Sequence, residues 1–518
     1  MDVLINQEMI RREEEAFRAG LTAAALMEAA GEGMAAIIME SYPHAKKFFV
    51  FIGKGNNGGD GLVVARVLAA AGKTVQVVLT SRGDQLGELA GSRLKLLREA
   101  VTPVEIVPWQ SEFVFPGSDA VVIDALLGIQ GKGPLRGVLA EVVSKMNEAR
   151  ATNFFRTVAL DFPSGLARAG GQVRMENRDD AVVADMTIAV GFAKEALGRE
   201  IHAAWVGRLE VAPWSQVPAA SDLHQILVPS ELARLLPRRS AFSHKGDYGR
   251  LAIIAGSPGF AGAATLCALA AQAMGMGLLS VVTRPEALAQ VAAQAPHEAM
   301  ISAWADLENI PDVIENATAI VIGPGLGTDA VAEKMLRAVL TRKCPVLIDA
   351  DGLNILGQHL AWLREAKGPL LLTPHPGEMG RLIGRKFAPE EREGIARDFP
   401  DWHKLTLVLK GTRTLVTTSG QPLYTNTTGN PGLSTGGSGD TLSGMIGALL
   451  AQGLAPLDAA RLGVWLHGHA ADLVLAERGC EEGMTPTMLS ANLGRALVSL
   501  RRHAAPRPGL IERARELV

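Results

Sequence analysis

The sequence predicts an α/β protein with two domains, each built on its own parallel sheet. Short apolar runs of strand length, such as Phe48–Ile52 and Leu251–Ala255, alternate with longer helical stretches along the chain. Glycine-rich turns follow several of these runs, as is typical of the carboxyl edge of a parallel sheet. The alternation lapses around Pro213–Ser221 into proline, alanine and serine. We therefore expect a first domain over residues 1–220, a second over 221–505 and a polar, dispensable tail over 506–518.

The first half contains the following expected elements. Strands are predicted at Phe48–Ile52, Val75–Leu79, Val121–Asp124 and Val158–Asp161, and helices at Gln7–Arg18, Ala23–Glu40 and Gly61–Ala71. Strands separated by helices imply a parallel sheet with right-handed crossover connections.

The second half repeats this rhythm without repeating the motifs. Its predicted strands are Leu251–Ala255, Leu278–Thr283, Ala319–Ile322, Val346–Asp349, Leu370–Leu372 and Leu405–Leu409, and its predicted helices include Ala263–Met274 and Thr441–Ala451. No charged residue lies between Arg250 and Arg284, a length that would permit a membrane span. Because Ser257-Pro258-Gly259 and Gly262 interrupt this stretch, we interpret it as a buried βαβ unit.

Composition excludes several classes of protein. The chain has 518 residues, of which 48% are apolar and 20% charged, so it is not a disordered chain. A net charge of −3 and 5% aromatic residues argue against a nucleic-acid partner. The amino terminus has no signal-peptide pattern, and we expect no membrane partner. Cys267, Cys344 and Cys480 lie far apart without disulfide or zinc spacing, which predicts a cytoplasmic location.

The first chemical motif is the segment Gly53-Lys-Gly-Asn-Asn-Gly-Gly-Asp-Gly61, between a predicted strand and a predicted helix. Its glycines would let a ligand approach the backbone. A helix that starts at Asp60–Gly61 would offer free N–H groups to an anion. The alternative is a plain hairpin turn at Asn-Gly, but a hairpin needs strands on both sides and the downstream segment is helical.

Two aspartates end neighbouring predicted strands. Asp124 opens the segment Asp-Ala-Leu-Leu-Gly-Ile-Gln-Gly-Lys-Gly-Pro134, and Asp161 opens Asp-Phe-Pro-Ser-Gly165. Either aspartate alone could be a helix cap or a turn former. Together with the Asn/Gly loop they converge on one sheet edge, which favours a site. The oxygens of Asn57, Asp124 and Ser164 could also hold a hard cation.

Over residues 1–215 this combination resembles the NAD(P)H-hydrate epimerase family, which has a Rossmann-like fold. The resemblance implies a potassium ion bound by Asn57, Asp124 and Ser164, and Asp161 as the residue for acid–base chemistry. It also implies that hydrated nicotinamide nucleotide contacts Asn56, Asn57, Gly58, Gly59, Asp60, Gly128, Ile129, Gln130, Gly131, Lys132, Gly133, Pro134 and Asp161.

The strongest motif of the second half is Thr435-Gly-Gly-Ser-Gly-Asp440, which leads into the apolar helix predicted at Thr441–Ala451. Backbone N–H groups at such a helix start can hold the charge of a transferring phosphoryl group. Asp440 at its head can accept the proton of an attacking hydroxyl. The alternative is a flexible glycine linker with Asp440 as a helix cap, but a linker would not run directly into so apolar a helix.

Weaker motifs follow other predicted strands. They are Gly323-Pro-Gly-Leu-Gly327, Asp349-Ala-Asp351, Thr373-Pro-His-Pro-Gly-Glu378 and Lys410-Gly-Thr-Arg-Thr414. A lone strand-end lysine is usually solvated, and a lone histidine is usually structural. The two carboxylates of Asp349 and Asp351 could order a loop or help to bind a metal.

In this order, over residues 225–503, these motifs resemble the ADP/ATP-dependent NAD(P)H-hydrate dehydratase family, which has a ribokinase-like fold. The resemblance implies ADP as phosphoryl donor, with magnesium. It places the hydrate against Ala263, Leu326 or a near neighbour, His375 and the base Asp440. The adenine nucleotide would contact Lys410, Gly411, Thr412, Arg413, Thr414 and Gly439.

Both halves in one chain resemble the bifunctional NAD(P)H-hydrate repair enzymes. This implies hydrated NADH and NADPH (NADHX and NADPHX) as substrates, R/S epimerisation by the first domain, ADP-dependent dehydration of the S form by the second, and a homo-oligomer. One alternative is a ribokinase-like small-molecule kinase. In that case the first half would be a non-catalytic binding module, as in the mRNA-decapping scaffold proteins that it also resembles.

Overall fold

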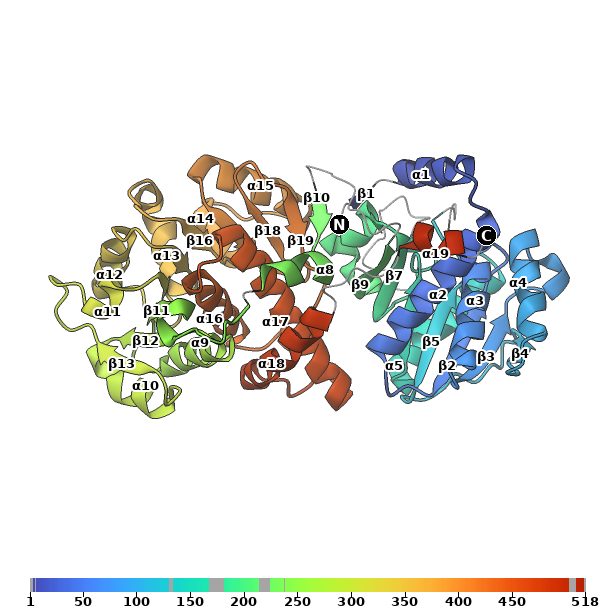
Figure 1. Cartoon of the computed structure of the whole chain (residues 1–518), viewed down its shortest axis with the longest axis horizontal. Coiled ribbons are helices and arrows are strands. Elements are labelled where there is room, and N and C mark those ends of the chain that lie inside the picture. Colours follow the sequence, from blue (N-terminus) through green and yellow to red (C-terminus); the bar gives the residue numbers. More distant parts are fainter. Residues whose placement is uncertain are drawn as a thin grey trace. The chain divides into compact units, whose positions relative to one another are not determined.

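The computed structural model describes residues 3–4, 6–129, 134–166, 181–213, 224–236, 238–502 and 509–516. The chain forms two compact units, one of residues 1–220 with 506–518 and one of residues 221–505 (Figure 1). The chain therefore leaves the first unit, forms the second and returns to the first. The domain boundary expected near residue 220 falls within 214–223, which lie outside the described residues.

The first unit is built on a parallel sheet of seven strands, counted over its described residues. In spatial order they are β4 (Glu105–Pro108), β3 (Thr74–Leu79), β2 (Lys47–Ile52), β5 (Ala120–Ala125), β6 (Arg156–Leu160), β7 (Met186–Gly191) and β9 (Arg208–Pro213). Every neighbouring pair is parallel. The chain winds outward from β2 through β3 to β4 and then from β5 to β9, so the strand order reverses between β2 and β5.

Successive side chains of a strand point to opposite faces of the sheet, and here both faces carry apolar side chains. Helices therefore cover both faces. The side chains of Val50 and Ile123 pack with α2 (Ala23–Ser41), α3 (Asn56–Ala70) and α4 (Glu88–Arg98). Phe51 and Val122 pack on the other face with α5 (Val138–Asn153). The α/β fold class predicted for this half is confirmed.

Helix α3 begins earlier than the sequence predicts. It starts at Asn56, with Gly55 as an extended N-cap, so the prediction of a start at Asp60–Gly61 is wrong. The reason is tertiary packing: a Cβ at Gly58 would lie 2.1 Å from the carbonyl oxygen of Gly53, and one at Gly61 would lie 2.4 Å from the Cβ of Ala125. These glycines let the first turns of α3 pack against the sheet, and that close packing outweighs their low helix propensity.

The carboxyl-terminal segment is part of the first unit and not a dispensable polar tail, so that expectation is wrong. Helix α19 (Leu510–Glu516) packs against α2. Leu510 is 2% exposed and Ala514 is fully buried in the core that α2 and α3 share. This packing could not be predicted from the sequence, because two buried apolar side chains in a short charged helix give only a weak amphipathic pattern.

The second unit is built on a ten-stranded sheet, counted over its described residues. In spatial order the strands are β10 (His224–Ile226), β19 (Leu423–Thr425), β18 (Leu415–Thr418), β17 (Thr406–Leu409), β16 (Leu370–Leu372), β15 (Val346–Ile348), β14 (Ala319–Ile322), β11 (Arg250–Ile254), β12 (Leu278–Thr283) and β13 (Met300–Ala303). Only β18 pairs antiparallel, with β17 and β19, among these described strands. The order reverses between β11 and β14.

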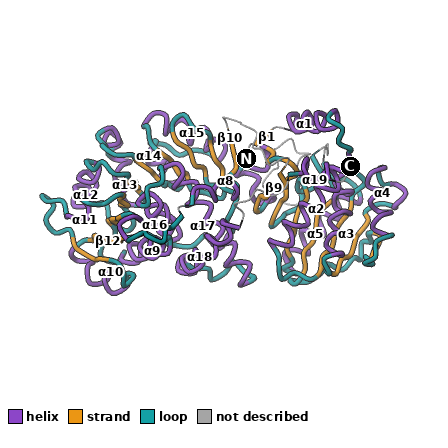
Figure 2. The backbone as a smooth tube through the Cα atoms, viewed as in Figure 1, coloured by secondary structure: helices purple, strands orange, loops and turns teal. Residues whose placement is uncertain are grey.

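Two layers of helices enclose the second sheet (Figure 2). One face carries α9 (Ala261–Ala273), α16 (Ser438–Ala451), α17 (Pro456–Arg478) and α18 (Pro486–Arg502). The other carries α12 (Ala330–Leu340), α13 (Asp351–Gln358), α14 (Pro376–Leu382) and α15 (Arg392–His403). Helix α16 starts at Ser438, three residues before the predicted Thr441, with Gly437 as N-cap in the left-handed conformation.

The remaining described elements are short or peripheral. They are β1 (Val3–Leu4), which pairs with β8 (Ala193–Lys194), and α1 (Asn6–Arg18), α6 (Glu195–Gly198), α7 (Ala203–Val206), α8 (Pro229–Leu232), α10 (Leu288–Gln294) and α11 (Asp312–Glu315). In the part of the chain that the structure describes, no helix has the length and apolar character to cross a membrane.

Candidate active sites in the two units

Three strand ends of the first unit meet where its strand order reverses. The segment Gly53–Asn57 follows β2, Asp124 lies near the end of β5, and Asp161 directly follows β6. These strands are parallel neighbours, so their carboxyl ends share one edge. Ligands of doubly wound sheets bind at this edge, beside the reversal of strand order.

Asp124 and Ser164 form a buried hydrogen-bonded pair. The hydroxyl of Ser164 donates to Oδ1 of Asp124 at 2.6 Å, and its backbone N–H donates to Oδ2 at 2.8 Å. Burial raises the pKa of Asp124 to about 6, opposed by the hydrogen bonds from Ser164. No ion pair joins this carboxylate to a described residue, and a buried carboxylate without a counter-charge fits a bound cation.

Asn57 is buried with its amide unsatisfied. It is 7% exposed, and neither Oδ1 nor Nδ2 has a hydrogen-bond partner among the residues described. Buried polar side chains almost always have partners, so this amide is placed for a ligand. The side-chain oxygens of Asn57, Asp124 and Ser164 are hard ligands, which fits the cation that the resemblance implies.

Asp161 is held by a lysine that the sequence analysis missed. Nζ of Lys194 lies 2.5 Å from Oδ1 of Asp161 and 2.6 Å from the carbonyl oxygen of Val190. Oδ2 of Asp161 faces the loop after β5, since a Cβ built at Gly128 would lie 3.5 Å from that oxygen and 3.5 Å from the Cβ of Asn57. Asp161 and Asn57 therefore flank Gly128.

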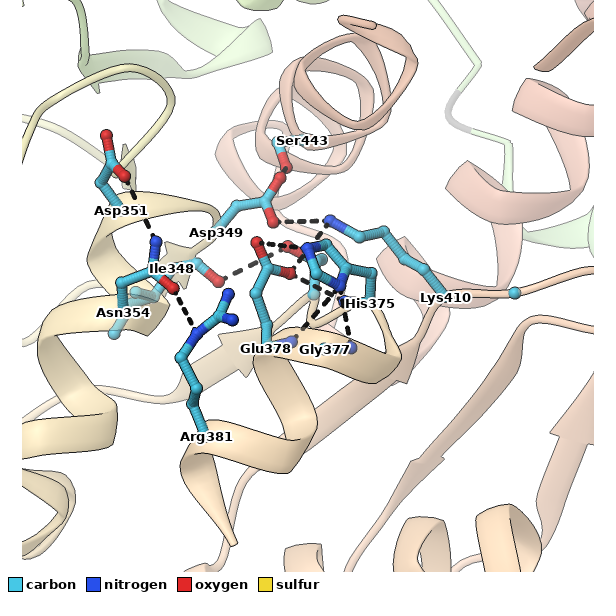
Figure 3. Close-up of polar contacts among 12 residues, drawn as sticks. Ile348, Asp349, Asp351, Asn354, His375, Gly377, Glu378, Arg381, Lys410 and Ser443 are labelled. Carbon is cyan, nitrogen blue, oxygen red and sulfur yellow. Dashed lines mark hydrogen bonds and ion pairs between the residues drawn. The ribbon is translucent and has the colours of Figure 1, made fainter. Parts of the chain in front are cut away.

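The second unit brings four polar side chains together at the carboxyl edge of its sheet (Figure 3). Asp349, which follows β15, accepts hydrogen bonds from Lys410 Nζ at 2.7 Å and from the Ser443 hydroxyl at 2.7 Å. Lys410 Nζ also lies 3.8 Å from Oε2 of Glu378, which is 5% exposed. Burial raises the pKa of Glu378 to about 7, and Lys410 opposes the rise.

Asp440 lies in the first turn of α16 beside this cluster. Burial first, and then the charge of Asp349, raise its pKa to about 7, while Lys410 lowers it. Its carboxylate accepts no hydrogen bond from a described residue, so the alternative in which Asp440 is an ordinary helix cap is wrong. A half-buried, unpaired carboxylate with a pKa near neutrality suits a general base.

His375 is the N-cap of α14. Its Nδ1 accepts hydrogen bonds from the backbone N–H groups of Gly377 at 3.0 Å and Glu378 at 3.3 Å. Burial, then the charges of Lys410 and Arg381, lower the pKa of His375. The neutral ring therefore carries its proton on Nε2, and its half-exposed edge lies at the site.

Leu326 does not present its side chain to the site. It is fully buried in the core under α12 and α13, so the predicted contact of Leu326 or a near neighbour with the hydrate would come from backbone or from a neighbour. Its neighbours line the edge instead. Gly325 has a φ of +58°, and a Cβ there would lie 3.0 Å from the Cβ of Ala263, so Ala263 and the Gly325 backbone adjoin.

Arg413 likewise has a buried side chain. Its side chain is 3% exposed, and burial lowers the pKa of its guanidinium to about 10. Its side chain is thus part of the interior, and the nucleotide contact implied at Arg413 stays a prediction for its backbone. Gly439 is better placed, since a Cβ there would lie 3.4 Å from Lys410 Nζ. Gly411 and Thr412 are exposed in the same turn.

Magnesium has no evident cluster of ligands. Among the described residues, no group of three or more His, Cys, Asp or Glu side chains could hold a metal ion. We therefore assign no residue as a magnesium ligand.

Known proteins match both units. Residues 251–495 match a family described as NAD(P)H-hydrate dehydratase, and residues 23–196 match a family described as YjeF-related protein N-terminus. A protein of Coxiella burnetii, named bifunctional NAD(P)H-hydrate repair enzyme Nnr, is 35% identical over 96% of this chain and 100% of its own length. This chain belongs to the family of bifunctional NAD(P)H-hydrate repair enzymes.

Two further similar proteins are a relative of the same name and a solved structure. The protein of the same name from Escherichia coli is 35% identical over 92% of this chain and 90% of its own length. A crystal structure of the ADP/ATP-dependent NAD(P)H-hydrate dehydratase from Bacillus subtilis, co-crystallised with ATP and Mg²⁺, is 31% identical. It covers 54% of this chain and all of its own length, with a TM-score of 0.49.

Membership of the repair family confirms the family resemblance found in the sequence. It also confirms the predicted fold class, a Rossmann-like unit followed by a ribokinase-like unit. The alternative of a small-molecule kinase with a non-catalytic first half is set aside, because the relatives match across both halves. The structure brings Asp349, Lys410, Glu378 and Asp440 together. Four predicted contacts, Gln130, Gly131, Lys132 and Gly133, lie outside the described residues.

Three residues near these sites, Lys194, Ser443 and Arg381, had no role predicted from the sequence. Lys194 lies in the sequence Val-Gly-Phe-Ala-Lys, and the available signal was a lone lysine at the end of a buried apolar run. Ser443 lies three residues after Asp440 in the predicted helix. Residues at this spacing lie on the same face of a helix, so its nearness to Asp440 could have been predicted. Arg381 lies six residues after His375 in a helix with no local sign of a ligand.

Proposed function

We propose that the two units repair NADHX and NADPHX with the residues described above. The first unit interconverts the R and S hydrates at Asp161. The second removes water from the S hydrate after ADP phosphorylates it, with Asp440 as the base. The entire hydrate pool can then be restored through one S-specific step.

The observation that carries this proposal is the state of Asp440. Its carboxylate is unpaired among the residues described, and its pKa is raised to about 7 by burial and by Asp349. It lies two residues into α16, whose first N–H groups have no helical partner and favour an anion. A proton acceptor and an anion site therefore adjoin, as phosphoryl transfer to a hydroxyl requires.

The dehydration takes two steps, phosphoryl transfer and elimination. The hydroxyl oxygen of the S hydrate attacks the terminal phosphorus of ADP, Asp440 takes the hydroxyl proton, and AMP leaves. The phosphate then departs from the ring carbon with the bonding electrons, the adjacent carbon loses a proton, and the ring double bond is restored. Phosphate is a much better leaving group than hydroxide, so the nucleotide serves to make this elimination fast.

The nucleotide contacts are assigned to backbone and lysine. Lys410, Gly411, Thr412 and Thr414 lie in the turn after β17, and Gly439 lies against Lys410 Nζ. The N–H groups at the start of α16 are the natural partners of the phosphates. Arg413 would contribute through its backbone, because its side chain is interior.

The epimerisation is assigned to the first unit. Asp161 gives a proton to the ring hydroxyl, which leaves as water. Water then adds to the opposite face of the ring and returns a proton to Asp161, so no net proton is gained or lost. The first-turn residues Asn56–Asp60 and the loop at Gly128, Ile129 and Pro134 would bind the nucleotide. Asn57, Asp124 and Ser164 would hold potassium, which supplies positive charge beside the buried Asp124 carboxylate.

Two further expectations complete the proposal. Cys267, Cys344 and Cys480 are free, which fits the reducing cytoplasm. Self-association into a homo-oligomer is expected from the family resemblance. Light scattering of the full chain tests the oligomer, and cell fractionation tests the location.

One experiment tests the proposed function. Purified full-length protein is incubated with a mixture of R and S NADPH hydrates, with and without ADP, and NADPH absorbance is followed. We expect complete recovery with ADP and none without it. Recovery that stops once the S hydrate is consumed would refute the epimerase assignment, and no recovery would refute the dehydratase assignment.

A further inference from the structure

An open cleft of about 520 Å³ lies in the second unit with no role in the assignments above. It is lined by Thr328, Asn354, Gly357, Gln358 and Arg381. These residues come from the segment after β14, from α13 and from α14. The lining offers a hydroxyl, two amides and a guanidinium but no carboxylate, so its chemistry favours an anionic, hydrogen-bonding ligand.

A chain of hydrogen bonds fixes the guanidinium of Arg381, and Figure 3 shows its links through Asp351 and Asn354. The Gly327 N–H donates to Oδ2 of Asp351 at 2.9 Å, and Nδ2 of Asn354 donates to Oδ1 of Asp351 at 3.3 Å. Nε of Arg381 then donates to Oδ1 of Asn354 at 2.8 Å. Arg381 is thereby oriented through a single nitrogen.

The two terminal nitrogens of Arg381 remain available. Neither Nη1 nor Nη2 has a partner among the residues described, and no carboxylate pairs with this guanidinium. Lys410, by contrast, has carboxylates beside it, with its Nζ 2.7 Å from Asp349 and 3.8 Å from Glu378. A guanidinium that is oriented through Nε and open at both Nη atoms is suited to bidentate binding of a phosphate.

The cleft adjoins the residues assigned to the reaction. Arg381 lies on α14, which His375 caps, and a Cβ at Gly377 would lie 3.9 Å from Nη1 of Arg381. Gly327, at the start of the hydrogen-bond chain, closes the loop that adjoins Ala263. The cleft and the site assigned to the hydrate therefore share helix α14 and the loop that follows β14.

We propose that this cleft binds a phosphate of the dinucleotide substrate through Arg381 and Thr328, away from the reacting ring. This inference rests on the proposed dehydratase function. The phosphate has two sources: the pyrophosphate bridge, which NADHX and NADPHX share, and the ribose phosphate, which only NADPHX carries.

The test compares Arg381→Gln with the unmodified full-length protein. Initial rates are measured with S-NADHX and with S-NADPHX, at saturating ADP. Loss of charged hydrogen bonds should raise KM by roughly 10- to 100-fold while kcat changes little. A rise with both substrates supports binding of the pyrophosphate, and a rise with NADPHX alone supports binding of the ribose phosphate.

Controls keep the inference separate from folding and from the proposed function. Arg385→Gln is the matched variant, because that arginine pairs with Glu391 away from the cleft, and its KM should stay at the unmodified value. Thr328→Val gives a second test within the lining that removes only one hydroxyl. Quenching or enhancement of NADPH fluorescence measures binding without turnover, so the cleft can be tested even if repair fails.

The inference is overturned if Arg381→Gln, with an unchanged melting curve, keeps both KM values within about twofold of the unmodified protein. It is also overturned if the KM for ADP rises instead, since the guanidinium would then serve the nucleotide donor. Arg381→Lys should restore only part of the affinity, because an ammonium keeps the charge but not the bidentate geometry.

Discussion

Lys194 and Asp161 form a buried ion pair in the first unit, with Nζ 2.5 Å from Oδ1. The lysine side chain is 1% exposed. Asp161 has a φ of +64°, a left-handed conformation that is uncommon for a residue other than glycine. The N–H of Val190 also donates to Oδ1, at 3.2 Å. One carboxylate oxygen is thus fixed, and the other faces the site.

The first prediction concerns this pair. Lys194→Met should destabilise the first unit by about 3–5 kcal/mol, because it leaves the Asp161 carboxylate buried without a counter-charge. Combining it with Asp161→Asn should recover most of that stability, since no charge remains, but not the epimerisation. Calorimetry and R-hydrate conversion measure the two effects. Equal stability of the single and double variants would show that the ion pair is not the cause.

The second prediction concerns the cation. Potassium should raise the melting temperature of the first unit, because an ion that binds only the folded state stabilises it, by about 2.7 kcal/mol at 100 times its Kd. Asn57→Ala should reduce this effect, whereas Asn56→Ala should preserve it, since Asn56 is exposed and Asn57 is buried. Choline chloride at equal ionic strength is the control. A shift of the same size in choline chloride would exclude a specific site.

The third prediction is a pH dependence of dehydration. Asp440 acts as a base only when ionised, and its pKa is raised to about 7, so kcat/KM should fall about tenfold per pH unit below that value and level off above it. Lys410 favours the ionised form, so Lys410→Met should move the inflection to higher pH. Asp349 opposes ionisation, so Asp349→Asn should move it lower. Shifts in the reverse directions would contradict the assignment of this inflection to Asp440.

The fourth prediction concerns the return of the chain to the first unit. Leu510→Ala should destabilise that unit by about 2–5 kcal/mol, because Leu510 is 2% exposed in its core. Dehydration by the second unit should be unaffected. Val498→Ala is the matched control, since Val498 is 45% exposed. An unchanged first-unit transition in Leu510→Ala would show that α19 does not contribute to stability.

The sequence was most informative where local pattern and tertiary environment agree. Strands buried on both faces are continuous apolar runs, and the predicted Leu278–Thr283 and Ala319–Ile322 coincide with β12 and β14. The starts of α3 and α16 were misplaced because glycines lower local helix propensity, while their close packing is visible only in three dimensions. Strands β18 and β19 had no prediction, since short antiparallel strands resemble loops.

The sequence predicts which residues lie at strand ends, but it does not predict which side chains pair with them. Asp124, Asp161 and Asp440 were found because each follows an apolar run or a glycine-rich turn. The partner of Asp161 is 33 residues away along the chain, and Asp349 meets Ser443 over 94 residues. Pairings of this length depend on strand order, which the sequence pattern does not specify. For the same reason the sequence did not show that the side chains of Leu326 and Arg413 turn into the core.

The most direct test of the account is whether the two chemistries separate by mutation. Asp440→Asn keeps size and hydrogen bonding but removes the base, and Asp161→Asn does the same in the first unit. NADPH recovery is measured from each separated epimer with each variant, together with melting curves. We expect Asp440→Asn to lose dehydration of the S hydrate by roughly 10²- to 10⁴-fold while R/S interconversion persists, and Asp161→Asn to show the reverse. Near-normal S dehydration by a folded Asp440→Asn variant would contradict the account.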